Sequence, residues 1–448
     1  MARSKCWVEM RTGLLPILFL LLIPGGGGVY SQTAVAGPAA TCPILKKEKS
    51  IISNRLTKAV GTLLKDSAGV GSNAKYSGAV ALVVYKGNVI YHQAVGQAQQ
   101  MWLDEKGRLV EHESPRLMQP DTLFDLASVT KVAATTTALM RLVSEGQLSL
   151  DDTLGEHLPE MVGTDKADIT LRQLLTHRSG LWQWQPSWLF LNEQKPDVVD
   201  YLAGLPRRYP IGERRAYSDF GFILLGKVIE RVTAVTLDQY VSRHIYQPLG
   251  MADTQYRPPA RLKQRIAATS HGNPFERKMI KTGKPYPMAR PIPDEQEFDY
   301  RQYTLVGEAN DGNAYYGLNG VAGHAGLFST AGDLAILGQT LINGGCYGKA
   351  RITDRETVKV FFQTPFDDNQ AHGYWASTSP DGAKVYWHPG FTGTQFLIQP
   401  QDELVVILLT NRQHPALPDK TEGYPSVKPV WQAVLDRVYS VLALSENG

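Results

Sequence analysis

Strand-like patterns at the two ends of the chain constrain its fold more than any other feature of the sequence. Residues 78–84 and 89–95 are apolar and β-branched, and they flank the turn sequence Lys86-Gly87-Asn88, which predicts a β-hairpin. Similar patterns return near the C-terminus at residues 384–388, 394–399 and 404–410. Because isolated hairpins are only marginally stable, we expect the two ends to share one antiparallel sheet.

The chain between these ends has mainly helical patterns. We predict helices at residues 129–144, 171–177, 220–232, 237–245, 331–342, 354–363 and 427–444. Capping boxes are predicted at Thr170/Gln173, Thr236/Gln239 and Thr353/Glu356. Residues 256–330 are rich in proline and glycine, so this stretch is either functional or contains an element that the pattern does not reveal.

These patterns predict an α+β fold with helices flanking the antiparallel sheet and a mainly helical lobe inserted into it. We expect a single domain over residues 45–445. Its sheet lobe would comprise about residues 50–125 and 330–445, and its helical lobe about residues 126–329.

The N-terminus has the pattern of an export signal. Basic residues precede an apolar run at residues 14–23, and Ala34-Val35-Ala36 supplies a cleavage site with small residues. This run is short for a membrane span, which needs about 20 residues. We therefore predict that residues 1–36 are a signal peptide and that the mature protein is periplasmic, without a stable transmembrane anchor. An uncleaved anchor in the inner membrane is the alternative.

Cysteine usage is compatible with export. Cys6 would leave with the signal, so Cys42 and Cys346 remain. They could form a disulfide in an oxidising compartment, but the sequence does not show whether they lie close enough. We expect two unpaired thiols, with the disulfide as the first alternative and a lipidated Cys42 as the second.

The charge balance excludes one class of partner. The 448 residues include 46 Lys and Arg against 43 Asp and Glu, a net charge of +3. Nucleic-acid binding needs a strongly basic face, so we expect no such partner. His271, His324 and His388 stand apart and no His-Glu-x-x-His occurs, so we expect neither a metal nor a cofactor. We expect the chain to act as a monomer.

The first candidate for catalytic chemistry is a Ser-x-x-Lys pattern, which occurs at Ser72/Lys75 and at Ser128/Lys131. Ser72 lies in a predicted turn, and we interpret it as structural. At Ser128 an irregular stretch meets an apolar helix, so the spacing places the serine hydroxyl and the Lys131 ammonium on one helical face. The helix N-terminus favours developing negative charge, and burial lowers the pKa of a lysine toward that of a usable base. An N-cap serine beside a surface lysine is the alternative.

Two further motifs are uninformative when each is taken alone. Tyr217-Ser218-Asp219 precedes an apolar helix, and a tyrosine close to Ser128 could pass protons to and from the nucleophile. Residues 388–394 (His-Pro-Gly-Phe-Thr-Gly-Thr) lie between two predicted strands, where glycines let a backbone approach a substrate. The amide of Phe391 could then join that of Ser128 in an oxyanion hole. An ordinary hairpin turn is the alternative.

In this order the three motifs resemble the serine β-lactamase and penicillin-binding protein superfamily, whose members include enzymes with Ser-x-x-Lys. Residues 126–131, 169–181 and 326–334 are similar to its class C-like branch. Further strings are similar to the penicillin-binding protein 4B type, whose members are assigned as D-alanyl-D-alanine carboxypeptidases. They lie at residues 266–269, 271–273, 320–326 and 411–412, and the whole resemblance covers about residues 50–440.

The resemblance implies a β-lactamase/transpeptidase-like fold, with Ser128, Lys131 and Tyr217 as the catalytic residues. It also implies a group of substrate-binding residues: Asp219, His388, Gly390, Phe391, Thr392 and His324. Two positions depart from the family pattern, since Asp219 replaces an amide and His388 replaces a lysine. A carboxylate cannot donate a hydrogen bond unless protonated, and histidine is a weak cation near neutral pH. Both departures disfavour the carboxylate of a β-lactam.

We therefore expect a serine hydrolase that forms an acyl-enzyme, with a peptide ending in D-Ala-D-Ala as the first substrate candidate. An esterase for small esters or a weak β-lactamase is the alternative, and a non-catalytic penicillin-binding or peptidoglycan-binding sensor is a further one. No Gly-x-Ser-x-Gly occurs in the sequence, which excludes the nucleophile elbow of α/β-hydrolases.

Overall fold

The computed structural model describes residues 41–47, 51–70, 74–191, 197–293, 298–418 and 423–446. The predicted signal peptide and Ser72 lie outside these ranges. Among the helices of the described ranges, none combines the length and the apolar character that a membrane crossing requires.

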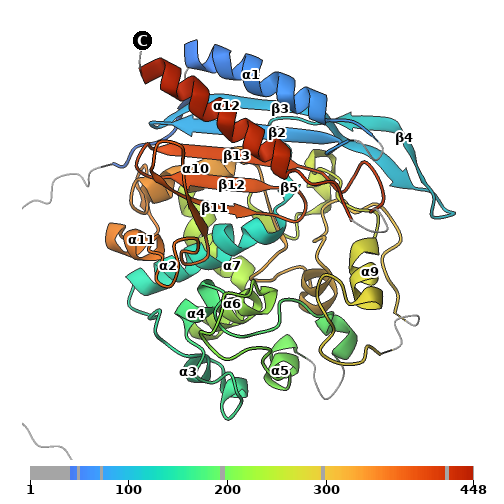
Figure 1. Ribbon diagram of the computed structural model, residues 1–448, viewed down its shortest axis with the longest axis vertical. Helices are drawn as coiled ribbons and strands as arrows, with labels where there is room; N and C mark the ends of the chain where they lie inside the picture. Colours follow the sequence, from blue (N-terminus) through green and yellow to red (C-terminus); the bar gives the residue numbers. More distant parts are fainter. Residues whose placement is uncertain are drawn as a thin grey trace, which may run out of the picture. The chain divides into compact units, whose positions relative to one another are not determined.

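The two ends of the chain meet in one sheet, as predicted (Figure 1). Within the described ranges this sheet has eight strands. In spatial order they are β1 (Lys46–Lys47), β3 (Asn88–Leu103), β2 (Gly78–Tyr85), β13 (Leu404–Thr410), β12 (Gln395–Gln399), β11 (Lys384–Pro389) and β10 (Trp375–Thr378), with β4 (Leu109–Leu117) paired to β3. The central pair β2–β13 is antiparallel and joins the N-terminal hairpin to the C-terminal strands.

Both faces of the central strands are buried, because their side chains alternate between two hydrophobic cores. In β13, Val405, Ile407 and Leu409 belong to the core on the side of the helical lobe. Leu404, Val406 and Leu408 belong to the core on the opposite face. A strand that is covered on both sides has a continuous apolar sequence, which explains why the sequence predicted this strand.

Two terminal helices, α1 (Ile51–Ser67) and α12 (Lys428–Glu446), cover one face of the sheet (Figure 1). Three helices lie on the other face: α2 (Thr137–Ser144), α10 (Ala331–Ile342) and α11 (Arg355–Phe361). The remaining helices form the inserted lobe: α3 (Leu154–His157), α4 (Leu171–Leu175), α5 (Val198–Ala203), α6 (Asp219–Thr233), α7 (Leu237–Val241), α8 (Gln247–Leu249) and α9 (Pro274–Thr282). Helix α6 is the centre of this lobe, with buried side chains on most of its surface.

Smaller strands complete the fold. Strands β5 (Phe124–Asp125), β7 (Leu327–Ser329) and β6 (Gln255–Tyr256) form a small sheet beneath the start of α2, and β8 (Cys346–Tyr347) pairs with β9 (Ala350–Arg351). The irregular stretch at residues 256–330 contains α9, so an element was indeed missed there. The same stretch also supplies residues to the candidate active site described below.

The local capping predictions had mixed outcomes. The capping box at Thr170 and Gln173 is confirmed. The prediction at Thr236 is wrong, because its hydroxyl donates to Asp238 and caps no backbone amide. The prediction at Thr353 is also wrong, because Asp354 is the N-cap and accepts from the amide of Thr357. An aspartate directly after a threonine offers the stronger acceptor.

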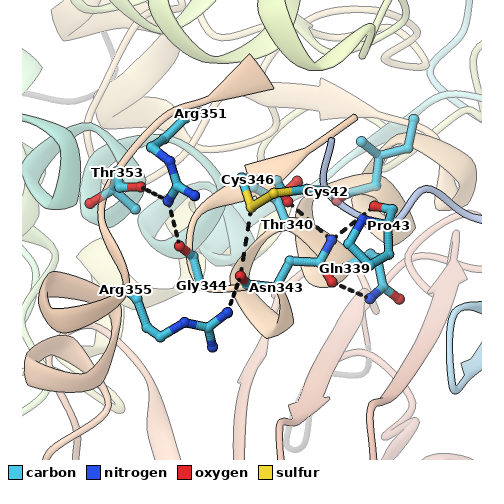
Figure 2. Close-up of a disulfide and its surroundings, with 11 residues drawn as sticks. Cys42, Pro43, Gln339, Thr340, Asn343, Gly344, Cys346, Arg351, Thr353 and Arg355 are labelled. Carbon is cyan, nitrogen blue, oxygen red and sulfur yellow. Dashed lines mark hydrogen bonds between the residues drawn. A yellow bond between two sulfur atoms is a disulfide. The ribbon is translucent and has the colours of Figure 1, made fainter. Parts of the chain in front are cut away.

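The expectation of two unpaired thiols is wrong, because Cys42 and Cys346 form a disulfide (Figure 2). Their Cα atoms lie 5.9 Å apart, and 304 positions separate them in the sequence. Asn343, at the end of α10, donates from its amide to the carbonyl oxygens of Pro43 and Cys346 at 2.9 and 3.0 Å. These contacts attach the first described segment to the sheet lobe, and they also exclude a lipidated Cys42 from this structure.

Candidate active site

Ser128 lies in a tightly bent segment between β5 and α2. Ala127 has a positive φ of 44°, an uncommon conformation for a residue with a side chain, and residues 127–129 form a 3₁₀ turn. The Ala127 amide donates to one carboxylate oxygen of Asp125 at 2.8 Å, and the Asn310 amide donates to the other at 2.7 Å. Burial raises the pKa of Asp125 to about 6. These bonds fix the backbone that presents the Ser128 hydroxyl.

Residues 390–394 hold the same segment from the side of the sheet. The Thr392 hydroxyl donates to the carbonyl of Asp125 at 2.7 Å, and the Thr394 hydroxyl donates to that of Leu126 at 2.9 Å. A Cβ on Gly390 would lie 2.0 Å from Thr394 Oγ1 and 2.4 Å from the oxygen of Leu126. Gly390 and Thr392, which are predicted to bind substrate, are both buried against the segment that carries Ser128.

Lys131 is fully buried one helical turn after Ser128. Its ammonium donates to Ser128 Oγ at 3.1 Å, to Asp219 Oδ1 at 2.6 Å and to the carbonyl of His324 at 3.1 Å. Burial lowers the pKa of Lys131, but the Asp219 carboxylate acts in the opposite direction and the net shift is upward. The expectation that burial makes this lysine a free base is therefore wrong, because Asp219 holds its proton.

Tyr217 lies in the loop before α6, which is fixed by its neighbour Ser218. The Ser218 amide donates to His177 Nδ1 at 3.1 Å, and its hydroxyl caps α6 by accepting from the Gly221 amide. The Tyr217 hydroxyl interacts electrostatically with Lys131 and Ser128, and the Lys131 ammonium lies 4.9 Å from the centroid of the Tyr217 ring. Burial raises the pKa of Tyr217, and the nearby ammonium offsets only part of that shift, so the phenol stays protonated.

His388 lies behind Tyr217, with 6.1 Å between the ring centroids, and it is fully buried. Burial, with a smaller effect of Lys131, lowers the pKa of His388 to about 3, so the ring is neutral at physiological pH. Its Nδ1 contacts the carbonyl of Pro389 at 2.8 Å, and its Nε2 has no partner among the described residues. His388 therefore supplies no positive charge to the site.

His324 is likewise buried, and it does not reach the substrate pocket. Its Nε2 lies 2.8 Å from Asp311 Oδ1, while its carbonyl accepts from Lys131. Burial raises the pKa of Asp311, but His324 acts against this and the net shift is downward. His324 therefore contacts Lys131 and Asp311 and is not among the described residues that line the pocket.

A pocket of about 900 Å³, partly open to solvent, lies in front of these residues. Ser128, Tyr217, Asp219 and the half-exposed Phe391 line it. Aromatic and apolar side chains supply most of the rest: Ala127, Trp184, Pro274, Phe275, Met279, Pro285, Tyr286, Ala325 and Tyr424. Among the described residues that line it, Asp219, Glu276 and Asp311 are acidic and none is lysine, arginine or histidine.

Glu276 and Asp311 are pocket residues that sequence reasoning missed. Glu276 accepts from the Gly312 amide at 2.7 Å and from Asn273 Nδ2 at 2.6 Å. Burial raises the pKa of Glu276, and the neighbouring Asp311 adds to the shift. The one available signal was Asn273-Pro274, a typical helix start that could have revealed α9 and placed Glu276 in its first turn.

A buried Ser-Lys pair beside a tyrosine, set between an antiparallel sheet and an inserted helical lobe, defines a class of serine hydrolases that work through an acyl-enzyme. The family model described as "Beta-lactamase" matches residues 56–425. The chain belongs to this family.

Relatives with curated names support this assignment. A protein of Escherichia coli (strain K12) named "Putative D-alanyl-D-alanine carboxypeptidase" is 32% identical, over 81% of this chain and 86% of that protein. A protein of Bacillus subtilis (strain 168) named "N-acetylmuramyl-L-alanine amidase" is 31% identical, over 88% of this chain and 89% of that protein. The chain is therefore an enzyme of the serine hydrolase type.

Solved structures show the same fold. A penicillin-binding protein homologue from Caulobacter crescentus has a TM-score of 0.62 at 19% identity, covering 90% of this chain and 99% of its own. A class C β-lactamase from Rhodobacter sphaeroides has a TM-score of 0.59 at 19% identity, covering 87% and 99%. The predicted β-lactamase/transpeptidase-like fold is confirmed.

Proposed function

We propose that this chain hydrolyses peptide or ester carbonyls through an acyl-enzyme on Ser128. The observation that carries the proposal is the hydrogen bond of 3.1 Å from the Lys131 ammonium to Ser128 Oγ, with Tyr217 beside the ammonium at the base of an open pocket. Ser128 Oγ forms a bond to the substrate carbonyl carbon, and the leaving amine or alcohol departs with a proton. Water then attacks the ester and releases the acid, which restores the serine.

The proton path runs through the Lys131–Asp219 pair. When a substrate excludes water from the pocket, the neutral form of this pair becomes more favourable than the ionic form. One ammonium proton then passes along the 2.6 Å hydrogen bond from Lys131 Nζ to Asp219 Oδ1, and the amine that remains accepts the hydroxyl proton of Ser128. Tyr217, in contact with both groups, passes a proton to the leaving group.

The oxyanion of the tetrahedral intermediate lies between two backbone amides in this proposal. Ser128 supplies one from the first turn of its helix, where the backbone dipoles favour negative charge. Phe391 supplies the other from the turn after β11, which is held in place by the hydroxyls of Thr392 and Thr394.

Ser128→Ala tests the nucleophile. We expect the variant to lose p-nitrophenyl ester hydrolysis and covalent labelling by a fluorescent penicillin while its circular dichroism is unchanged. The matched control is Ser72→Ala in the other Ser-x-x-Lys pattern, which should change neither the ester hydrolysis nor the penicillin labelling. Labelling that persists in Ser128→Ala would refute the assignment.

The substrate class follows from the relatives and from the pocket charges together. The name of the E. coli relative supports a peptide ending in D-Ala-D-Ala as the substrate. However, Asp219 and Asp311 line the pocket and no lysine, arginine or histidine does so among the described residues, so a terminal carboxylate would find no positively charged side chain there. This observation favours a second candidate, namely an ester or a peptide whose terminal group is uncharged.

A matched pair of peptides separates these two candidates. We expect a D-Ala-D-Ala peptide with a C-terminal amide to have a kcat/KM at least about tenfold higher than the same peptide with a free carboxylate. Release of alanine and of alanine amide, measured by mass spectrometry, gives both rates. A preference for the free acid would instead support a carboxypeptidase and show that these acidic residues do not set specificity.

We also propose that the protein is exported to the periplasm after cleavage of residues 1–36 and acts there as a monomer. The Cys42–Cys346 disulfide supports an oxidising compartment. N-terminal sequencing of exported protein should begin at or near Gly37, and a membrane-bound chain that starts at Met1 would refute cleavage. Light scattering measures the molar mass in solution and so tests the monomer. An octamer like that of the Pyrococcus abyssi penicillin-binding protein homologue would refute it.

A further inference from the structure

A second groove lies at the outer edge of the large sheet, on the face covered by α12. Its floor comes from side chains on one face of three adjacent strands, among them Trp375 of β10, Trp387 of β11 and Gln395 of β12. Trp431 and Tyr439 of α12 form its wall. This edge groove, defined by these five residues, has a volume of about 1140 Å³ and is partly open to solvent.

The tryptophans of the edge groove form an aromatic surface that the fold does not fully cover. Trp375 and Trp387 are cross-strand partners with ring centroids 5.8 Å apart and planes inclined by 31°. Both are half-buried, whereas Trp431 is packed into the core with 7% exposure. The result is a fixed aromatic platform, open on the side of the two outer strands.

Two polar groups of the edge groove lack hydrogen-bond partners within the described ranges. Gln395 is 3% exposed, and its Oε1 has no donor. The indole Nε1 of Trp375 has no acceptor. A buried polar group without a partner is costly, so such groups are normally satisfied by protein, water or ligand. One acceptor and one donor without partners are thus buried beside the aromatic surface of this groove.

We propose that the edge groove binds the pyranose rings of a neutral oligosaccharide. The C–H groups on one face of a pyranose carry partial positive charge and pack against the electron-rich face of an indole. Its hydroxyls both donate and accept, so they match Gln395 Oε1 and the Trp375 indole NH. No acidic residue lines the groove among the described residues, and Lys428 is its single basic one, which fits an uncharged ligand.

The edge groove lies next to the active site at Trp375. The ring of Trp375 lies 6.4 Å from that of Tyr217, and Pro389, next to His388, also lines the groove. A sugar in the groove would thus hold an attached acyl or peptide group near Ser128. This last step rests on the proposed hydrolase activity, whereas sugar binding itself does not.

Binding of chitotetraose and cellotetraose to Ser128→Ala tests the proposal without any turnover. We expect saturable quenching of tryptophan fluorescence, confirmed by calorimetry. Trp387→Ala should weaken binding by roughly three- to tenfold through loss of stacking. Gln395→Leu should weaken it as well. The matched control is Trp102→Ala, which removes a 42% exposed tryptophan from the other end of the sheet and should leave affinity unchanged.

Several outcomes would overturn the proposal. These are no binding of either sugar at millimolar concentration, equal affinity in Trp387→Ala, or the same loss in Trp102→Ala. Uptake of the apolar dye ANS without sugar binding would identify a hydrophobic docking surface instead. In the catalytically intact chain, Trp387→Ala should leave p-nitrophenyl acetate hydrolysis unchanged. If Ser128 proved not to be the nucleophile but the protein still bound the sugars, the proposed function would fail and this inference would hold.

Discussion

Lys131 is subject to two opposing influences, and their balance decides its protonation state. Complete burial favours the neutral amine, whereas the Asp219 carboxylate at 2.6 Å favours the ammonium. The net rise in the pKa of Lys131 means that the pair is ionic before substrate binds. Any base catalysis by this lysine must therefore begin with a proton transfer to Asp219.

Replacing Asp219 with asparagine should change the pH dependence of catalysis. Without the carboxylate, burial dominates and the pKa of Lys131 falls below its ordinary value, so the lysine becomes a base that titrates by itself. We expect kcat/KM of Asp219→Asn for an uncharged ester to be about tenfold or more lower at pH 6 than at pH 8. The parent enzyme should be nearly flat over this interval, because its lysine needs no net deprotonation.

Lys166 and Asp165 provide the matched control for this experiment. Lys166 is 1% exposed and contacts Asp165 at 2.5 Å, away from the pocket. Asp165→Asn should keep the pH profile of the parent enzyme. A flat profile in Asp219→Asn would contradict the proton path through this pair.

At the scale of elements, the turn after β11 positions the nucleophile. The hydroxyls of Thr392 and Thr394 hold the carbonyls of Asp125 and Leu126, three and two residues before Ser128, and Gly390 allows this close approach. This turn is at the end of a strand in the sheet, so the rigidity of the sheet is transmitted to the catalytic serine.

Gly390→Ala should disturb that contact. Its Cβ would overlap Leu126 O and Thr394 Oγ1, which costs about 1–3 kcal/mol of stability if the backbone shifts to relieve it. Displacement of Ser128 by about 1 Å would lower kcat by roughly 100-fold. Ester hydrolysis and urea unfolding measure the two effects. The control is Gly332→Ala in α10, where the nearest atom to the new Cβ is 3.7 Å away, and an equal loss there would refute the explanation.

Elements with a strong local pattern were predictable from the sequence. Helix α10 was predicted at its observed bounds, and β2 and β13 were found because strands buried on both faces are continuously apolar. The edge strand β4 was missed, since most of its side chains are exposed and polar. Local sequence describes an element well only when that element buries a regular set of side chains.

The site was only partly predictable for the same reason. Ser128 and Lys131 lie within one helical turn, so their spacing alone predicted contact. Tyr217 and His388 were linked to them only through the family resemblance. Glu276 and Asp311 enter the pocket from loops whose paths depend on tertiary packing, and no local pattern predicts such paths.

At the scale of the whole molecule, the Cys42–Cys346 disulfide closes a long loop around most of the domain. Reduction, or the change Cys42→Ser, should lower the free energy of unfolding by about 2–5 kcal/mol. Cys42 is the better position for the variant, because Cys346 is buried and a hydroxyl there would be desolvated. Urea unfolding with and without dithiothreitol measures the effect.

The Cys42→Ser variant is also the control for the reductant. It should unfold at the midpoint of the reduced parent protein and show no further response to dithiothreitol. An unchanged midpoint for the parent protein after verified reduction would contradict a stabilising role for the bond.

The pairing of β2 with β13 also determines when the enzyme can become active during its synthesis. Strand β2 is translated more than 300 residues before the partner that completes its sheet, and the turn that holds Ser128 is translated just before that partner. A ribosome-bound chain that already contains Ser128, Lys131 and Tyr217 thus lacks the turn that positions Ser128. The site of this enzyme can therefore assemble only when synthesis of the chain is nearly complete.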